Sequence, residues 1–133
     1  HNPVTWDPDG GVPFDEKARQ EIFDQLDKPY ISGITFSGGD PFHSANRPEV
    51  RNFMAEIKER YPDKTIWLYT GDVWENVKND VSMQYIDVLV DGEFIVEEKD
   101  TRLRWKGSRN QRVIDVQESL KQKDAAPVLH CEN

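Results

Sequence analysis

Apolar residues follow two alternating patterns along the first two thirds of the chain, one with helical spacing and one of short continuous runs. In residues 15–27 and 47–61, apolar side chains recur every three or four positions, which predicts two amphipathic helices. A weaker pattern predicts a short helix over residues 73–79. Continuous apolar runs predict three buried strands, over residues 31–36, 65–70 and 85–90.

This alternation predicts an α/β fold in which helices cover a parallel sheet, because parallel strands need a crossover connection between them. The pattern then changes, and residues 103–106 and 112–116 predict two short strands around a loop. From residue 119 the chain is polar and weakly patterned. We therefore expect one domain over residues 1–133, with a loose tail over 119–133.

Each predicted strand is followed by glycine and an acidic residue. The three strand ends read Ser37-Gly38-Gly39-Asp40, Thr70-Gly71-Asp72 and Asp91-Gly92. Ligands of α/β proteins bind at the carboxyl ends of parallel strands, on the loops that follow. We therefore expect these residues to meet at one rim of the sheet.

The stretch GITFSGGDPFH, residues 33–43, allows two interpretations. Glycines at a strand end let a ligand approach the backbone closely, and Asp40 could accept hydrogen bonds from a ligand ammonium group. Alternatively, the same residues form a tight turn in which Asp40 caps the backbone before Pro41. A phosphate-binding loop is excluded, because the Lys-Ser/Thr pair of that motif is absent.

Composition narrows the class of protein. The 133 residues carry 25 acidic and 17 basic side chains, a net charge of −8, which disfavours nucleic acid as a partner. No apolar run reaches the about 20 residues of a membrane span, so we expect no membrane association. The single cysteine, Cys131, excludes an internal disulfide and suits the reducing cytoplasm.

Four motifs, in order along the chain, resemble one family of proteins. SGGDP resembles the GGE/GGD element of radical S-adenosylmethionine (SAM) enzymes, and HNPVTWDPDGG resembles the stretch after the CxxxCxxC motif in activases of glycyl-radical enzymes. YIDVLVDGEF and LRWKGSRNQRVIDV resemble the branch of this family that serves anaerobic (class III) ribonucleotide reductase. The resemblance extends from His1 to about Val116.

The resemblance implies a partial, incomplete β/α barrel of the radical-SAM type. It also implies an oxidoreductase with a 4Fe–4S cluster, which three cysteine thiolates hold and whose open iron binds SAM. Reductive cleavage of SAM would give a 5′-deoxyadenosyl radical that abstracts a hydrogen atom from a glycine of the partner protein. The cofactor carries the difficult chemistry, and the protein positions the reactants.

By resemblance, Gly38, Gly39 and Asp40 contact the methionyl end of SAM. His1 and Asn2 would lie beside the third cluster cysteine.

Two further residues, Thr70 and Asp91, end neighbouring strands, where the family places polar groups near SAM or a bound cation. For Asp91, a simple Asp-Gly turn is the alternative. The donors of Arg109, Asn110 and Gln111 could hold the adenosine, shape a docking rim or make plain loop hydrogen bonds.

The chain departs from the family in one respect, because it has no CxxxCxxC motif. The family places that motif directly before His1, so we expect the cluster loop and the N-terminal barrel strand to be missing from this chain. Two interpretations stay open. Either the protein has this segment and it is disordered without its metal, or the protein lacks it and binds no cluster.

The leading hypothesis is an enzyme that activates anaerobic ribonucleotide reductase by generating a glycyl radical on it. Its partners would be the large subunit of the reductase and a flavodoxin-like electron donor. The alternatives are an activase of another glycyl-radical enzyme, and a cluster-less module that only docks the partner.

Overall fold

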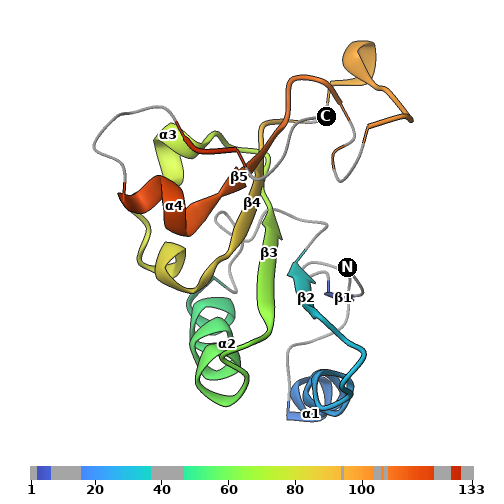
Figure 1. The fold of residues 1–133 in the computed structure, drawn as a ribbon, viewed down its shortest axis with the longest axis vertical. Coiled ribbons are helices and arrows are strands. Elements are labelled where there is room, and N and C mark those ends of the chain that lie inside the picture. Colours follow the sequence, from blue (N-terminus) through green and yellow to red (C-terminus); the bar gives the residue numbers. More distant parts are fainter. Residues whose placement is uncertain are drawn as a thin grey trace.

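Five strands form one sheet whose spatial order, β1-β2-β3-β4-β5, is also their order in the chain (Figure 1). The computed structural model describes residues 3–6, 16–36, 47–93, 95–103, 106, 108–121 and 127–129. The first four strands run parallel, and the fifth is antiparallel to β4. The strands are β1 (Pro3–Trp6), β2 (Gly33–Phe36), β3 (Thr65–Tyr69), β4 (Val88–Asp91) and β5 (Arg112–Asp115).

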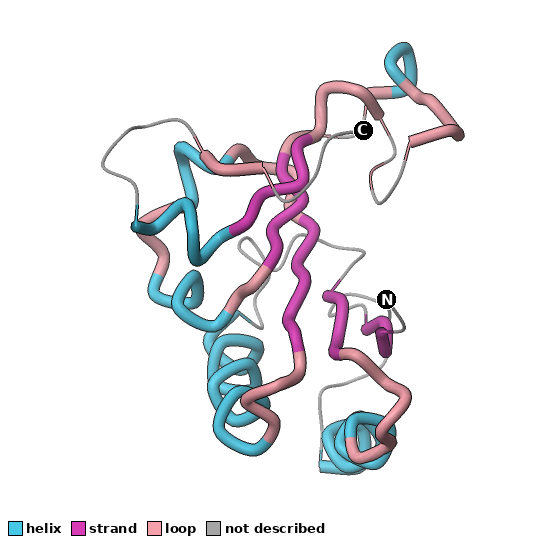
Figure 2. Tube along the Cα trace, viewed as in Figure 1, coloured by secondary structure: helices cyan, strands magenta, loops and turns pink. Residues whose placement is uncertain are grey.

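Helices connect the parallel strands, as the alternating pattern predicts. The helices are α1 (Glu16–Leu26), α2 (Arg47–Arg60), α3 (Trp74–Val77) and α4 (Val116–Lys121), with 3₁₀ helices η1 (Val81–Tyr85) and η2 (Val96–Glu98). Figure 2 shows α2, α3 and α4 together on one side of the strands. The predicted α/β fold with a parallel sheet is therefore confirmed. No helix in the described part of the chain has the length and apolar character needed to cross a membrane.

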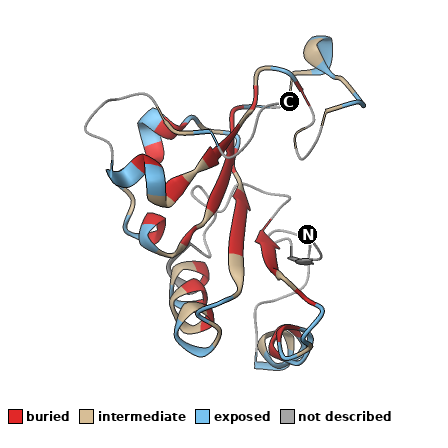
Figure 3. Ribbon diagram, in the orientation of Figure 1, coloured by how far each residue is buried: buried red, intermediate tan, exposed pale blue. Residues whose placement is uncertain are grey.

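The main hydrophobic core lies between the sheet and the helices, and buried residues follow the strands and the inner sides of the helices (Figure 3). The strands contribute Ile34, Phe36, Ile66, Leu68, Leu89 and Ile114, and α1 and α2 contribute Ile22, Phe23, Leu26, Val50, Phe53, Met54 and Ile57. A smaller cluster forms on the opposite face from Trp67, Val88, Val90 and Val113. Burial on both faces explains why the strands read as continuous apolar runs.

The third predicted strand begins later than the apolar run suggests. The run starts at residue 85, but residues 81–85 form η1, and β4 starts at Val88. The Asp80 carboxylate accepts a hydrogen bond of 2.9 Å from Ser82 N–H and so caps η1. Asp87 then accepts hydrogen bonds from Lys58 Nζ at 2.6 Å and Ile66 N–H at 2.8 Å. These polar contacts fix where the strand begins, and the apolar pattern does not reveal them.

Two further segments differ from the expectations. Strand β1, which pairs with β2 in parallel register, was not predicted because its four residues form no apolar run. Residues 103 and 106, the described ends of the predicted strand 103–106, lie in no strand.

Part of the expected loose tail packs against the sheet. Helix α4 continues to Lys121, and the Val128 carbonyl accepts a hydrogen bond of 2.8 Å from Asp115 N–H. Leu129 forms a β-bridge with Ile114, so residues 127–129 lie along the outer edge of β5.

Substitution of Gly33 tests how closely β2 pairs with β3. A Cβ atom at this position would lie 2.7 Å from Thr65 N and closer still to Thr65 O, which is backbone that cannot move aside. We expect Gly33→Ala to lower the free energy of unfolding by about 2 kcal/mol, because it overpacks the sheet. Urea unfolding measures this. Asn52→Ala, on the exposed side of α2, is the control and should change stability by less than about 0.5 kcal/mol. Equal midpoints for the two variants would contradict the close approach.

Candidate functional site

The rim at the carboxyl ends of β3 and β4 is held together by backbone hydrogen bonds. Thr70 N–H donates to the Val90 carbonyl at 3.0 Å, and Gly92 N–H donates to the Asp72 carbonyl at 2.7 Å. The predicted meeting of these two strand ends is therefore confirmed. Strand β2 runs parallel to β3, so Phe36, the last residue of β2, lies at the same end of the sheet.

The structure places two of the seven predicted ligand-binding residues, Thr70 and Asp91, at this rim. The other five lie outside the described residues: His1, Asn2, Gly38, Gly39 and Asp40.

Thr70 is buried and begins the turn that leads from β3 into α3. Its Oγ1 accepts a hydrogen bond of 3.1 Å from Asp72 N–H. The Asp72 carboxylate in turn accepts hydrogen bonds from Val73 N–H at 2.8 Å and Asn76 Nδ2 at 2.7 Å. Because each side chain satisfies backbone or side-chain donors of the next residues, the turn has a defined shape.

The Asp91 carboxylate lies on the helix-covered face of the sheet and is almost completely buried, with 1% of its surface exposed. Along β4, Leu89 and Asp91 share that face, whereas Val88 and Val90 point the other way. Trp74 N–H, the first backbone donor of α3, donates to Asp91 Oδ2 at 2.8 Å.

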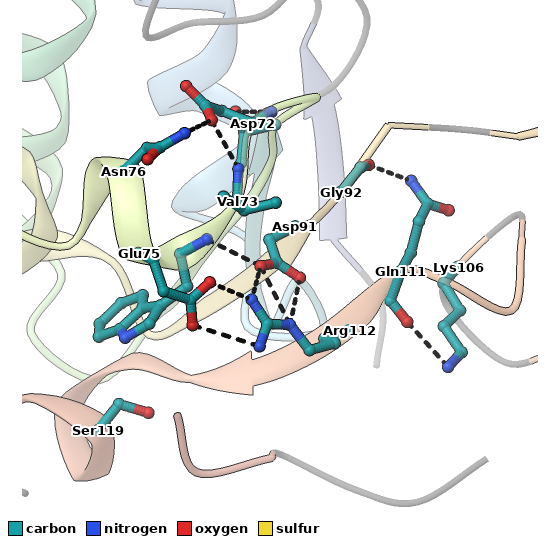
Figure 4. A network of polar contacts seen from close by, with 12 residues as sticks. Asp72, Val73, Glu75, Asn76, Asp91, Gly92, Lys106, Gln111, Arg112 and Ser119 are labelled. Atoms are coloured by element: carbon teal, nitrogen blue, oxygen red, sulfur yellow. Dashed lines mark hydrogen bonds and ion pairs between the residues drawn. The ribbon is translucent and has the colours of Figure 1, made fainter. Parts of the chain in front are cut away.

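Arg112 supplies the counter-charge of Asp91 (Figure 4). Its Nη2 lies 2.5 Å from Asp91 Oδ2, and its Nε lies 3.1 Å from Oδ1. Such an ion pair with two hydrogen bonds is stronger and better oriented than a single contact. Asp91 is therefore held by β5 and by α3 at the same time.

The same guanidinium also binds a second carboxylate. Arg112 Nη2 lies 2.8 Å from Glu75 Oε1, and Nη1 lies 3.4 Å from Oε2. The hydrogen bond from Arg112 lowers the pKa of Glu75, and the hydrogen bond to Asp91 raises the pKa of Arg112 further above its ordinary value. The three charged groups thus join α3, β4 and β5.

Hydrogen bonds also fix the turn that follows Asp91. Gly92 has a φ of 94°, a conformation that favours glycine. Gln111 Nε2 donates to the Gly92 carbonyl at 2.9 Å, and Asn110 Nδ2 donates to the Glu93 carbonyl at 2.7 Å. Gln111 Oε1 accepts from Ser108 N–H at 3.1 Å. Asn110 and Gln111 therefore make plain loop hydrogen bonds, one of the alternatives that the sequence left open.

The sequence interpretation missed Arg112 and Glu75 as parts of the rim. A usable signal was present, since VLVD and RVID can pair as antiparallel strands with Asp91 opposite Arg112. Opposite charges at directly opposed positions stabilise a β-ladder. Glu75 carried no comparable signal, because its contact depends on how α3 packs.

The residues present do not supply the ligands of an iron–sulfur cluster. Such clusters are held mainly by cysteine thiolates, and the sequence contains one cysteine, Cys131, which lies outside the described residues. Among the described residues, no group of three or more His, Cys, Asp or Glu side chains is placed to hold a metal ion. The described part of the rim therefore supplies hydrogen-bonding groups but no set of ligands for a cluster.

Comparison with known proteins gives consistent matches. Residues 1–114 match the family model described as a 4Fe-4S single cluster domain. The chain is 39% identical over 115 residues to a protein of Enterobacteria phage T4, an alignment that covers 85% of this chain and 72% of the relative. It is 39% identical over 115 residues to a Haemophilus influenzae protein, covering 84% and 74% of the two chains.

A third relative, from Escherichia coli K12, is 38% identical over 118 residues, covering 85% of this chain and 76% of the relative. All three relatives are named anaerobic ribonucleoside-triphosphate reductase-activating protein. No solved structure matches the chain.

Substitution of Arg112 tests whether this residue holds the rim. Arg112→Gln leaves the Asp91 carboxylate buried without a counter-charge, and we expect a loss of about 3 kcal/mol in the free energy of unfolding. The matched control is Arg102→Gln, which removes an exposed pair with Asp100 and should cost less than about 1 kcal/mol. Urea unfolding measures the free energy of unfolding of both variants. Similar losses in the two variants would mean that the Arg112–Asp91 pair stabilises the protein no more than an exposed ion pair does.

Proposed function

This chain belongs to the family of anaerobic ribonucleoside-triphosphate reductase-activating proteins, and on that basis we propose that it is an enzyme that activates such a reductase. The observation that carries the proposal is the 38–39% identity, which extends over 84–85% of this chain. The family match over residues 1–114 includes β1 to β4, most of β5 and the turns of the rim, not one short motif.

We further propose that activation consists of generating a glycyl radical on the reductase through reductive cleavage of SAM at a 4Fe–4S cluster. The cluster supplies the electron and the open iron that binds SAM. Its cysteine ligands are not among the residues of this chain, so these residues contribute to SAM binding, partner binding and exclusion of water.

In this proposal the sheet is part of an incomplete radical-SAM-type barrel. Parallel strands whose spatial order equals their chain order are the arrangement of a β/α barrel, and barrel enzymes carry their sites at the carboxyl ends of the strands. SAM would therefore bind at the rim where β3 and β4 end.

Gly38, Gly39 and Asp40 are assigned to the methionyl end of SAM, with the Asp40 carboxylate accepting from the ammonium group. His1 and Asn2 would lie on the cluster side.

The other two assigned residues, Thr70 and Asp91, contribute differently. Thr70 shapes the turn after β3 through its hydrogen bond to Asp72 N–H. The Asp91 carboxylate already accepts hydrogen bonds from Arg112 and Trp74, so we assign it the role of positioning the rim.

The proposed partners are the large subunit of the anaerobic reductase and a flavodoxin-like electron donor, in the cytoplasm. A second candidate function is a module that docks the reductase without binding a cluster. The two functions differ in whether the reductase acquires a radical.

Radical formation on the reductase tests the proposed function. The full-length natural protein that contains this chain is mixed anaerobically with iron, sulfide, SAM, a low-potential reductant and the reductase, and electron paramagnetic resonance is recorded. We expect the signal of a glycyl radical on the reductase. A relative such as the Escherichia coli protein serves as positive control. Radical formation by the relative but not by this protein would contradict the proposal and favour the docking module.

Substitution of Asp40 tests the assignment of the SAM site. Asp40→Ala removes the proposed acceptor for the SAM ammonium group, and we expect SAM to bind about tenfold more weakly, because a hydrogen bond to a charged group is lost. Titration calorimetry measures the affinity. Asp63→Ala, in the exposed loop before β3, is the matched control and should leave SAM affinity unchanged. Unchanged SAM affinity in Asp40→Ala would remove Asp40 from the site.

A further inference from the structure

The segment between β4 and β5 is an arm at the rim, which we define by its described residues 95–103, 106 and 108–111. It starts just after the carboxyl end of β4 and returns at the first residue of β5, so both of its ends lie at the rim. In Figure 1 this segment, drawn in orange, extends away from the sheet and the helices. We propose that this arm is the docking surface for the protein that is activated, and that it binds an acidic patch of the reductase through its basic side chains. The inference rests on the proposed function for the identity of the partner.

Charge distinguishes the arm from the rest of the chain. Residues 95–111 contain five of the 17 basic residues and three of the 25 acidic residues, a net charge of +2. With −8 for the whole chain, the remaining residues carry −10. An acidic protein surface would thus be repelled by most of this molecule and attracted to the arm. Such asymmetry orients a partner during approach.

Contacts within the arm hold it in one conformation. Lys99 and Ser108 form an antiparallel bridge, and Arg109 N–H donates to the Glu98 carbonyl at 2.9 Å. Ser108 is completely buried, and its Oγ accepts from Ile95 N–H at 3.2 Å. A surface that is ordered before binding loses less conformational entropy when the partner arrives.

The arm presents three exposed basic side chains, Lys99, Arg102 and Arg109, and one exposed acidic side chain, Glu97. Lys99 and Arg109 are exposed and form no ion pair with any residue in the described part of the chain. Val96 is 67% exposed, more than any other large apolar side chain among the described residues. Within the GSRNQR stretch, Asn110 and Gln111 bond inward and Arg109 points outward. The loop thus holds Arg109 where a partner can reach it.

The location of the arm favours a protein partner. The relatives are named for activating another protein, and a protein substrate must bring its reacting group to the rim. A segment that projects from that rim is then in reach of the partner's surface. Exposed side chains on a projecting segment contact a broad surface and do not enclose a small molecule, so we assign the basic residues to carboxylates of the reductase.

A double charge reversal tests this surface. Lys99→Glu with Arg109→Glu should weaken binding of the reductase at least about tenfold, because like charges would then face each other. The control is Lys17→Glu with Lys121→Glu, which changes the net charge equally but lies on α1 and α4, and it should change the affinity less than about twofold. Affinity is measured anaerobically without SAM, at two salt concentrations, and circular dichroism checks that the variants fold. The wild-type affinity should fall with added salt more steeply than that of the arm variant.

The possible outcomes separate this inference from the proposed function. Equal affinity of the arm variant and the control variant for the reductase would overturn docking at the arm. If the wild-type protein still formed the radical on the reductase, the proposed function would remain intact. Loss of binding in the arm variant alone, without any radical on the reductase, would support the docking surface and contradict the enzymatic function. If the arm variant lost affinity for an oligonucleotide but not for the reductase, the basic stretch would serve nucleic acid and the inference would be wrong.

Discussion

The buried carboxylate of Asp91 is the constraint on which the rim depends. A charge at this depth is costly unless it is paired, and Arg112 pairs it from the neighbouring antiparallel strand. The same Arg112 binds Glu75 of α3, and Asp91 also receives the first backbone N–H of that helix. A helix that follows β3, the end of β4 and the start of β5 are therefore fixed relative to one another by one set of charges.

In the proposed function, this arrangement gives the two parts of the rim different tasks. The parallel strands bring the carboxyl ends of β2, β3 and β4 to one end of the sheet, where the proposed SAM site lies. The arm between β4 and β5 projects from the same end and carries the basic residues. Because Arg112 begins β5 directly after the arm, the ion pair with Asp91 also anchors the base of the arm. Cofactor binding and partner docking would thus share one structural support.

Periodicity and turn chemistry were enough to predict much of this fold. Helices α1 and α2 and strand β3 begin and end within one residue of the predicted limits, because their apolar spacing reflects burial in one core. The start of β4 could not be predicted, since it depends on the contacts of Asp87 with Lys58 and Ile66. Asp91 was recognised as a strand-end acid, but its partner depends on the register of β5, which local patterns do not encode.

Amide hydrogen exchange in Arg112→Gln tests most directly whether the Asp91 pair holds the rim. Three amides report on it: Trp74, which donates to Asp91, Gly92, which donates to Asp72, and Gln111, which donates to Ser108. The account predicts that all three amides exchange faster together. The Ile66 N–H, which donates to Asp87 near the amino end of β3 and far from the rim, should keep its protection. Faster exchange at Trp74 alone would contradict it, because the pair would then be a local contact on which the rest of the rim does not depend.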